Sequence, residues 1–177
     1  MDLNSVKKAF TLIELVVVIA LVGVFTGMAV MNYVITNQSK NLASAKTEVL
    51  EMIRLARQQT QANQIQPSCT ADTFQGYGMA ANIGTNTVSL SYFCPAIAGT
   101  PLRSLALGTK YGGVAVTAFN SGAAPVANFF FKRLTGVTNT GTDITVCLQQ
   151  SALSKFSRIV VLSNGSIESY DNQTTCP

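Results

Sequence analysis

The chain has 177 residues, a formal net charge of +4 and only 11% charged side chains, and it contains no His and no Trp. Without His, the most common general base and metal ligand are both missing, and the mild basic excess contains no block typical of nucleic-acid-binding tails. Asp143 and Asp171 are isolated in the sequence, which argues against catalysis by paired carboxylates. We therefore expect a non-enzymatic protein with no cofactor and no bound metal.

A single carboxylate interrupts the apolar N-terminal segment. The apolar run Leu15–Met31 follows Lys7 and Lys8, and Glu14 stands just before it, inside a stretch otherwise fit for a membrane. A charged side chain at the centre of a bilayer helix costs about 2.5–3.5 kcal/mol on insertion scales, and such residues usually have a function. The segment is therefore expected either to leave the membrane or to meet a partner charge within it.

Three interpretations of this segment compete. A secretory signal peptide would use Lys7 and Lys8 as its basic region and Gly27–Ala29 as its cleavage site, but Glu14 interrupts its apolar region. A plain transmembrane anchor needs about 20 apolar residues, which Phe10–Val30 supplies only if Glu14 is tolerated. The third interpretation, a prepilin leader, explains Glu14.

The residues from Lys7 to Ala20, KKAFTLIELVVVIA, resemble the N-terminus of type IV prepilins and of type II secretion pseudopilins. The resemblance implies a leader peptide at residues 1–9, cut between Ala9 and Phe10 by a prepilin peptidase that then methylates the new Phe10 amine. Glu14 becomes the fifth residue of the mature chain. The family usually has Gly before the cut, and this chain has Ala9, which is also small.

The resemblance also suggests how the charges act. Lys7 and Lys8 would hold the N-terminus in the cytoplasm by the positive-inside rule, with the body of the chain on the other side of the membrane. In a filament, Glu14 would pair with the Phe10 ammonium of a neighbouring subunit or with its own. A low dielectric strengthens that pair, and a buried polar group can set the register of a helical bundle.

A long helix is predicted over residues 10–66. Leu42, Ala45, Val49, Ile53 and Ala56 recur at helical spacing, and Pro67 is expected to end the helix. The opposite side of the helix is predicted to be polar and to carry Lys46, Glu48, Glu51, Arg54, Arg57 and Gln58. Gly23 and Gly27 are either soft points that let the helix unwind or a Gly-x-x-x-Gly contact face between helices.

The remainder, residues 67–177, is predicted to form a β-rich head. Short segments rich in Val, Ile, Phe, Tyr and Thr predict strands at Phe74–Ala81, Thr87–Phe93, Val114–Phe119, Val126–Lys132, Ile144–Leu148, Arg158–Leu162 and Ile167–Tyr170. Asn164-Gly165 suits a type I′ hairpin turn. Surface loops are expected around Ala96–Thr109 and Asn120–Pro125. The fold class is α+β, with the long helix packed on an antiparallel sheet or small sandwich.

Four cysteines lie in the head, and none forms a CxxC pair. An even count behind a membrane-targeting segment indicates two disulfides in an oxidising compartment rather than a zinc site. Three pairings are possible. We favour Cys69–Cys94, which closes a local loop, and Cys147–Cys176, which holds the C-terminus.

Three segments, the first at the end of the predicted helix and the others in the head, are similar in order to the GspH/FimT branch of minor pilins: Leu55–Thr60, Gly76–Gly78, and Arg158–Val161 running into Asn164-Gly165. Some members of that branch bind DNA through a basic Gly-Arg-x-Arg turn. The matching stretch here, Gly165–Glu168, has neither arginine, so DNA binding is not supported there. Lys132, Arg133, Lys155 and Arg158 could form a basic patch, although a solvated strand end is the favoured interpretation.

The resemblance implies a structural subunit of a type IV pilus, major or minor, used for adhesion, twitching motility or DNA uptake. Its partners would be copies of itself, other pilins, an inner-membrane assembly platform and the peptidase. It would cross the cytoplasmic membrane once before assembly and then become extracellular. The alternative is a pseudopilin of a type II secretion system, and Asp171 alone is too little acid for the calcium site common in major pseudopilins. The C-terminal cysteine favours a pilin.

Overall fold

The computed structural model describes residues 11–94 and 97–176. The chain divides into two compact units, Met1–Asn37 and Gln38–Pro177, which we describe separately. Helix α1 (Leu12–Gln61) begins in the first unit and ends in the second. The predicted leader and the predicted processing residues Ala9 and Phe10 lie outside the described residues.

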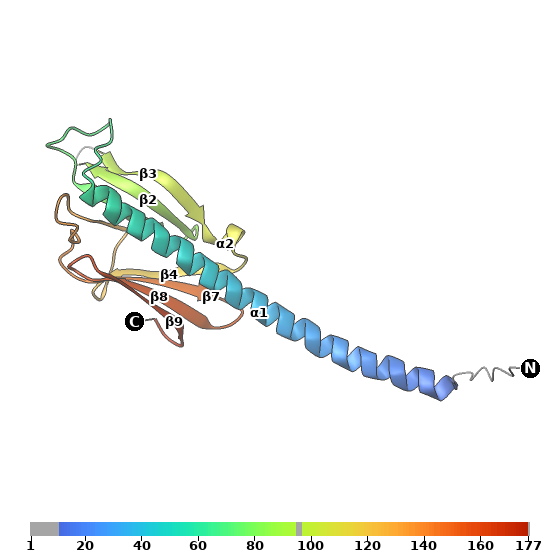
Figure 1. The fold of residues 1–177 in the computed structure, drawn as a ribbon. Helices are drawn as coiled ribbons and strands as arrows, with labels where there is room; N and C mark the ends of the chain where they lie inside the picture. Colours follow the sequence, from blue (N-terminus) through green and yellow to red (C-terminus); the bar gives the residue numbers. More distant parts are fainter. Residues whose placement is uncertain (1–10, 95–96, 177) are drawn as a thin grey trace, which may run out of the picture. The chain divides into compact units, whose positions relative to one another are not determined.

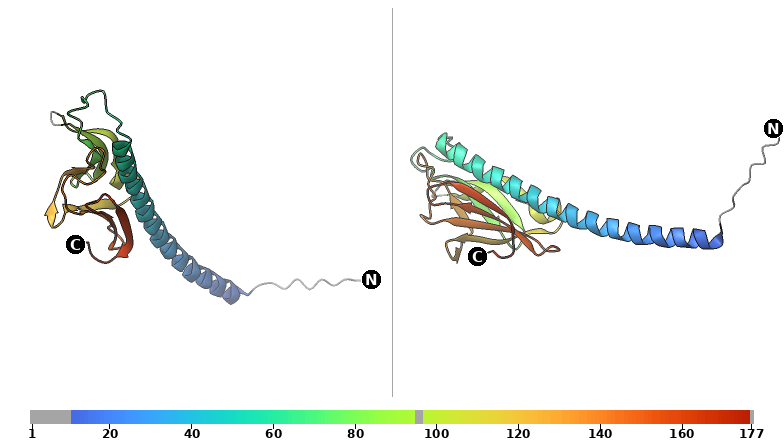
Figure 2. Two further views of the ribbon diagram at one scale, coloured as in Figure 1. Left: turned by 60° about the vertical axis from the view of Figure 1, so that its left-hand side comes forward. Right: turned by 60° about the horizontal axis from the view of Figure 1, so that its bottom comes forward.

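The second unit contains two antiparallel sheets (Figures 1 and 2). The first has the strand order β3-β2-β1-β6, with β1 at Gly76–Asn82, β2 at Thr87–Cys94, β3 at Ile97–Ala106 and β6 at Asn128–Phe130. The second has the order β5-β4-β7-β8-β9, with β4 at Val114–Ser121, β5 at Ala124–Pro125, β7 at Ile144–Gln150, β8 at Lys155–Val161 and β9 at Ile167–Gln173. A short helix, α2 (Leu107–Lys110), connects β3 to β4.

One hydrophobic core joins α1 to both sheets. The helix contributes the predicted stripe, and every member of it is buried: Leu42, Ala45, Val49, Ile53 and Ala56. Met52 is buried with them. Strand β8 contributes alternate residues, as expected for a sheet with one buried face, whereas β1 and β2 contain runs of consecutive buried residues. The predicted α+β fold, a long helix on antiparallel sheets, is therefore confirmed.

Several element boundaries differ from the prediction: β6 is shorter than the strand expected at Val126–Lys132, and the loop expected at Asn120–Pro125 contains the end of β4 and all of β5. The helix ends at Gln61 and not at Gln66; Asn63, with a φ of 52°, turns the chain into the left-handed region before Pro67 is reached. The expected loop at Ala96–Thr109 is wrong, because Ile97–Ala106 is a strand paired with β2. Its Pro and Gly residues are tolerated because β3 is an edge strand with register shifts against β2.

The predicted hairpin between β8 and β9 is present, but its turn is not type I′. The Gly165 amide donates to the Leu162 carbonyl at 2.8 Å, and Gly165 alone in this turn has a positive φ, 84°. A type I′ turn requires positive φ at both central residues. A side chain at Gly165 would also meet the Gly136 carbonyl oxygen at 2.1 Å, so this turn packs directly on another loop.

Candidate functional site

The first unit presents an apolar helix surface in every direction. Its large apolar side chains are exposed, with Leu12 at 81%, Phe25 at 69% and Met31 at 69% relative exposure. A helix that is apolar all round is stable only inside a membrane or among other apolar helices. By length and composition, α1 can cross a membrane. This surface, residues 12–35, is the first candidate functional site and is called the apolar segment below.

Glu14 lies in the first turn of α1, where the sequence analysis expected an assembly residue. Its backbone amide donates to Thr11 Oγ1 at 3.3 Å, so Thr11 caps the helix. Among the described residues, no cation forms an ion pair with the Glu14 carboxylate. Its predicted partner, Phe10, lies outside the described residues, so the pairing stays a prediction.

The polar and small residues of the apolar segment do not interrupt the helix. Thr26 satisfies its own hydroxyl by donating to the Val22 carbonyl at 2.7 Å. Gly23 and Gly27 are helical, and a Cβ added at either would meet no atom within 4 Å. Their proposed roles, unwinding or helix contact, remain predictions.

A cluster around Glu48 fastens α1 to the first sheet and α2. Glu48 is 9% exposed and accepts hydrogen bonds from Arg103 Nη2 at 2.7 Å, from Lys110 Nζ at 2.8 and 2.6 Å, and from the Tyr111 hydroxyl. Arg103 precedes the buried Leu105 by two positions, so both residues lie on the side of β3 that faces the core. One carboxylate therefore holds two cations and a phenol.

These contacts also set the ionisation of the Glu48 cluster. Burial would raise the pKa of Glu48, but hydrogen bonds from Lys110 and Tyr111 and the charges of Lys110 and Arg103 outweigh it, so the pKa lies below its usual value. The hydrogen bond to Glu48 raises the pKa of Lys110. Burial and then the Glu48 hydrogen bond raise the pKa of Tyr111. At neutral pH the carboxylate and the ammonium are both charged.

A further ion pair, separate from the Glu48 cluster, connects α1 to the other sheet. Lys46 Nζ lies 2.5 Å from Asp171 Oδ2 of β9, and the Lys46 side chain is only 13% exposed. Ser157 Oγ of β8 donates to the other oxygen of Asp171 at 3.2 Å. The prediction that Lys46 and Glu48 lie on the polar side of the helix, away from the core, is wrong, because both side chains are largely buried. Glu48 follows the buried Ala45 by three positions and precedes Met52 by four, a spacing that could have indicated its burial.

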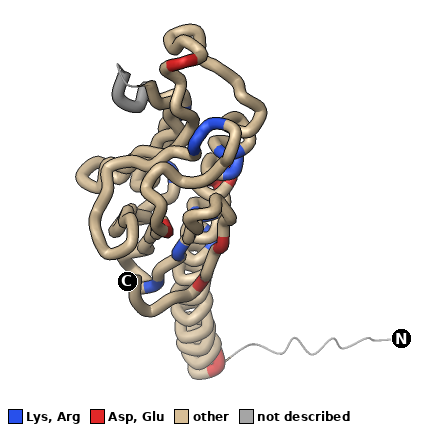
Figure 3. The backbone as a smooth tube through the Cα atoms, turned by 90° about the vertical axis from the view of Figure 1, so that its left-hand side faces the viewer, with Lys and Arg blue, Asp and Glu red and all other residues tan. Residues whose placement is uncertain are grey.

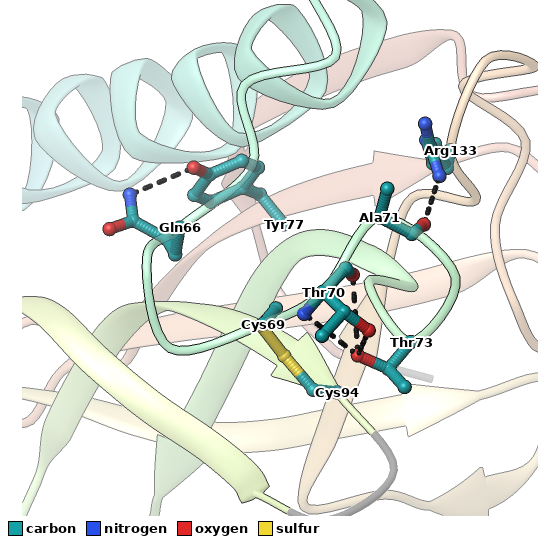
Figure 4. The surroundings of a disulfide bond; sticks show 8 residues. All are labelled: Gln66, Cys69, Thr70, Ala71, Thr73, Tyr77, Cys94 and Arg133. Atoms are coloured by element: carbon teal, nitrogen blue, oxygen red, sulfur yellow. Dashed lines mark hydrogen bonds between the residues drawn. A yellow bond between two sulfur atoms is a disulfide. The ribbon is translucent and has the colours of Figure 1, made fainter.

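Both favoured cysteine pairs are disulfides in the structure. Cys69–Cys94 has a Cα separation of 6.2 Å, and Cys147–Cys176 has one of 6.3 Å. The first joins Cys69, in the loop between α1 and β1, to Cys94 at the end of β2 (Figure 4). Two hydrogen bonds connect this loop to other parts of the head. Arg133 donates to the Ala71 carbonyl of the loop, and Gln66 of the loop donates to the Tyr77 hydroxyl of β1 at 2.9 Å. The second disulfide attaches the C-terminus to β7.

Two arginines of the predicted basic patch, Arg133 and Arg158, interact with different groups. Arg133 binds the Asn63 side chain and the Ala71 carbonyl, whereas the Arg158 guanidinium stacks over the Tyr170 ring at 4.5 Å. Figure 3 shows the charged residues of the second unit as scattered blue and red segments. Among the described residues, no group of three or more His, Cys, Asp or Glu side chains could hold a metal ion.

The fold is similar to those of two solved minor-subunit structures. The type IV minor pilin FimU of Pseudomonas aeruginosa aligns with a TM-score of 0.56 at 16% identity, covering 75% of this chain and 90% of that one. The minor pseudopilin EpsH of Vibrio cholerae aligns with a TM-score of 0.54 at 11% identity, covering 78% of this chain and 99% of that one. At these identities the likeness shows the fold alone.

Residues 4–30 match the family model of the prokaryotic N-terminal methylation motif. The chain therefore combines this N-terminal motif with a head that has the fold of minor pilins and pseudopilins. No curated protein matches the sequence of this chain. The family match covers the predicted processing residues and the apolar segment as far as Val30.

Proposed function

We propose that this pilin-like chain is a structural subunit of a type IV pilus that polymerises through its apolar segment. The observation that carries the proposal is the exposure of that segment on all sides, with Leu12 at 81% and Phe25 at 69%, behind a methylation motif at residues 4–30. Exposed apolar surface of this extent is covered either by lipid or by other subunits. The same surface thus serves as a membrane anchor before assembly and as the filament core afterwards.

Processing would create the partner of Glu14. Cleavage between Ala9 and Phe10 leaves an ammonium at Phe10, four residues from a carboxylate that no described cation neutralises. In apolar surroundings an unpaired carboxylate is costly and a matched pair is favourable. Pairing with the Phe10 ammonium of a neighbouring copy would therefore fix the axial register of the subunits. Methylation keeps the amine basic, so the pair survives this modification.

The orientation and partners follow from the same segment. Lys7 and Lys8 would keep the N-terminus cytoplasmic and leave the head on the far side of the membrane, where disulfides such as Cys147–Cys176 persist. A prepilin peptidase, other pilins and an inner-membrane assembly platform are the partners this route requires. The finished filament would act in adhesion, twitching motility or DNA uptake. The Gly165–Glu168 turn, which has no arginine, does not support DNA binding.

A pseudopilin of a type II secretion system is the second candidate function. The likeness to EpsH, titled a minor pseudopilin of that system, favours it as much as the likeness to FimU favours a pilus. The disulfide near the C-terminus inclines the proposal toward a pilin. Loss of secreted enzymes, without loss of surface filaments, after deletion of the gene would assign the chain to secretion.

The Glu14→Ala variant tests the assembly mechanism. We expect it to insert in the membrane at the wild-type level and to be lost at least tenfold from the sheared surface-filament fraction, because the register-setting charge is gone. Val16→Ala, which truncates an exposed apolar side chain of the same segment, is the matched control and should assemble. Normal filament yield from Glu14→Ala would refute the mechanism.

A further inference from the structure

The second unit contains a polar cleft that the proposed function does not use. It has a volume of about 410 Å³ and is lined by residues of α1, by Arg103 of β3 and by Tyr111, which follows α2. Apart from one alanine, its lining residues are Ser44, Thr47, Glu48, Glu51, Arg103 and Tyr111. The volume falls within the range of about 300–1,000 Å³ found for small-molecule sites.

Glu48 builds the walls of the cleft and is not available to a ligand. Both of its oxygens are already occupied, Oε1 by Arg103 and Lys110 and Oε2 by Lys110 and Tyr111. These bonds fix the Arg103 guanidinium and the Tyr111 ring beside the helix. A ligand therefore meets side chains that are already ordered, which reduces the entropy lost on binding.

The remaining lining groups offer both donors and acceptors. Arg103 uses only Nη2 in its contact with Glu48, its side chain is 51% exposed, and the other guanidinium N–H groups have no partner among the described residues. Glu51 is an acceptor without an ion pair or a side-chain hydrogen bond in the described part of the chain. Thr47 donates to the Ala43 carbonyl at 2.9 Å, which leaves its oxygen lone pairs free to accept.

This set of groups determines the class of ligand. A lipid or drug-like molecule needs a predominantly apolar lining, whereas this lining exposes apolar and polar surface in similar amounts. A simple anion would be repelled by Glu51, and a simple cation by Arg103. A hydroxyl can donate to a carboxylate and accept from a guanidinium at the same time. Adjacent hydroxyls on one ring can therefore form hydrogen bonds with both Glu51 and Arg103. We propose that the cleft binds a saccharide of one or two sugar units.

The first test is a binding measurement on the full chain in lipid nanodiscs. Saturation-transfer NMR with lactose, maltose, chitobiose and glucuronic acid should show transfer to at least one sugar, with a dissociation constant on the order of millimolar. Absence of transfer to all four overturns the proposal. Displacement of the bound sugar by an equal concentration of glycinamide would assign the cleft to peptide groups and also overturn it.

Two variants then locate the site. Ser44→Leu fills the cleft from an exposed helical position, and Glu51→Gln removes the acceptor charge while keeping the shape; each should weaken binding at least tenfold. Gln58→Leu, at another exposed position of α1, and Asp72→Asn, in the loop after α1, are the matched controls and should bind as the wild type does. If Ser44→Leu folds with an unchanged melting temperature and binds the sugar normally, the cleft is not the site.

Discussion

Glu48 carries more interactions than any other charged residue among those described. Its low exposure, 9%, would be costly for an unpaired carboxylate, and its four hydrogen bonds offset that cost. Removing one member of such a cluster leaves the others unpaired. The cluster therefore makes the position of α1 on β3 and α2 specific as well as stable.

The Glu48→Gln variant should lower the free energy of unfolding of the head by about 1–3 kcal/mol, because two cations lose their shared carboxylate. Glu51→Gln, one turn further along α1 and without an ion pair among the described residues, is the control and should change stability by less than about 0.5 kcal/mol. Thermal unfolding of the full chain in detergent measures both. Equal stability of the two variants would show that the cluster contributes nothing.

The pH dependence of stability should also come partly from Glu48. Its pKa is lowered in the folded state, so the unfolded state binds more protons between the two pKa values. The contribution is complete above the ordinary pKa of 4.5 and is lost as pH falls through the folded value. The free energy of unfolding should therefore fall more steeply from pH 7 to pH 3 for the wild type than for Glu48→Gln. Parallel curves would contradict this assignment.

Gly78 is required by the close approach of β1 to β6. A Cβ at this position would lie 1.9 Å from the Phe129 carbonyl oxygen. Because that oxygen belongs to the backbone, a change of side-chain rotamer cannot relieve the clash. Gly78→Ala should destabilise the head by about 1–3 kcal/mol or more. Gly84→Ala is the control, because its Cβ would meet only the Asn82 side chain at 3.5 Å. Comparable melting temperatures for the two variants would contradict this role for Gly78.

At the scale of elements, β9 depends on links outside its own ladder. It is an edge strand and five of its seven residues are exposed. Lys46 fastens it to α1 through Asp171, and Cys176, just after it, is joined to Cys147 of β7. These contacts hold a strand that buries little apolar surface.

Replacing both Cys147 and Cys176 by Ala should therefore lower the free energy of unfolding by about 2–5 kcal/mol, because the link closes a loop in the unfolded chain. Amide hydrogen exchange should rise first in β9, while β7, at the centre of its sheet, stays protected. Protection of β9 equal to that of the wild type would show that the strand is stable without the disulfide.

The helix was predictable because its periodicity runs through the whole core stripe, from Leu42 to Ala56. The burial of Lys46 and Glu48 was not, because a charged side chain is normally assigned to solvent and their partners lie far away in the sequence, at Asp171 and Arg103. Strand β3 was missed for a related reason. Its Gly, Pro and Ala residues indicate a loop locally, and only the pairing with β2 makes it a strand.

At the scale of the whole chain, the proposed assembly segment was easier to predict from the sequence than the structure of the head. Glu14 and the apolar run are local features, and a family model recognises them over residues 4–30. The cleft at Glu51 and Arg103 joins residues from distant segments, so no local pattern could reveal it. Function in this chain is thus divided between a segment recognisable by motif and a head recognisable by fold.

The central claim is that this chain is processed at Phe10 and built into a filament. Mass spectrometry of filaments sheared from the cell surface tests it most directly. The account predicts a chain that lacks residues 1–9 and begins with N-methylated Phe10. A mature N-terminus at Val30, as an ordinary signal peptide would leave, or an uncut chain found only in the membrane, would contradict it.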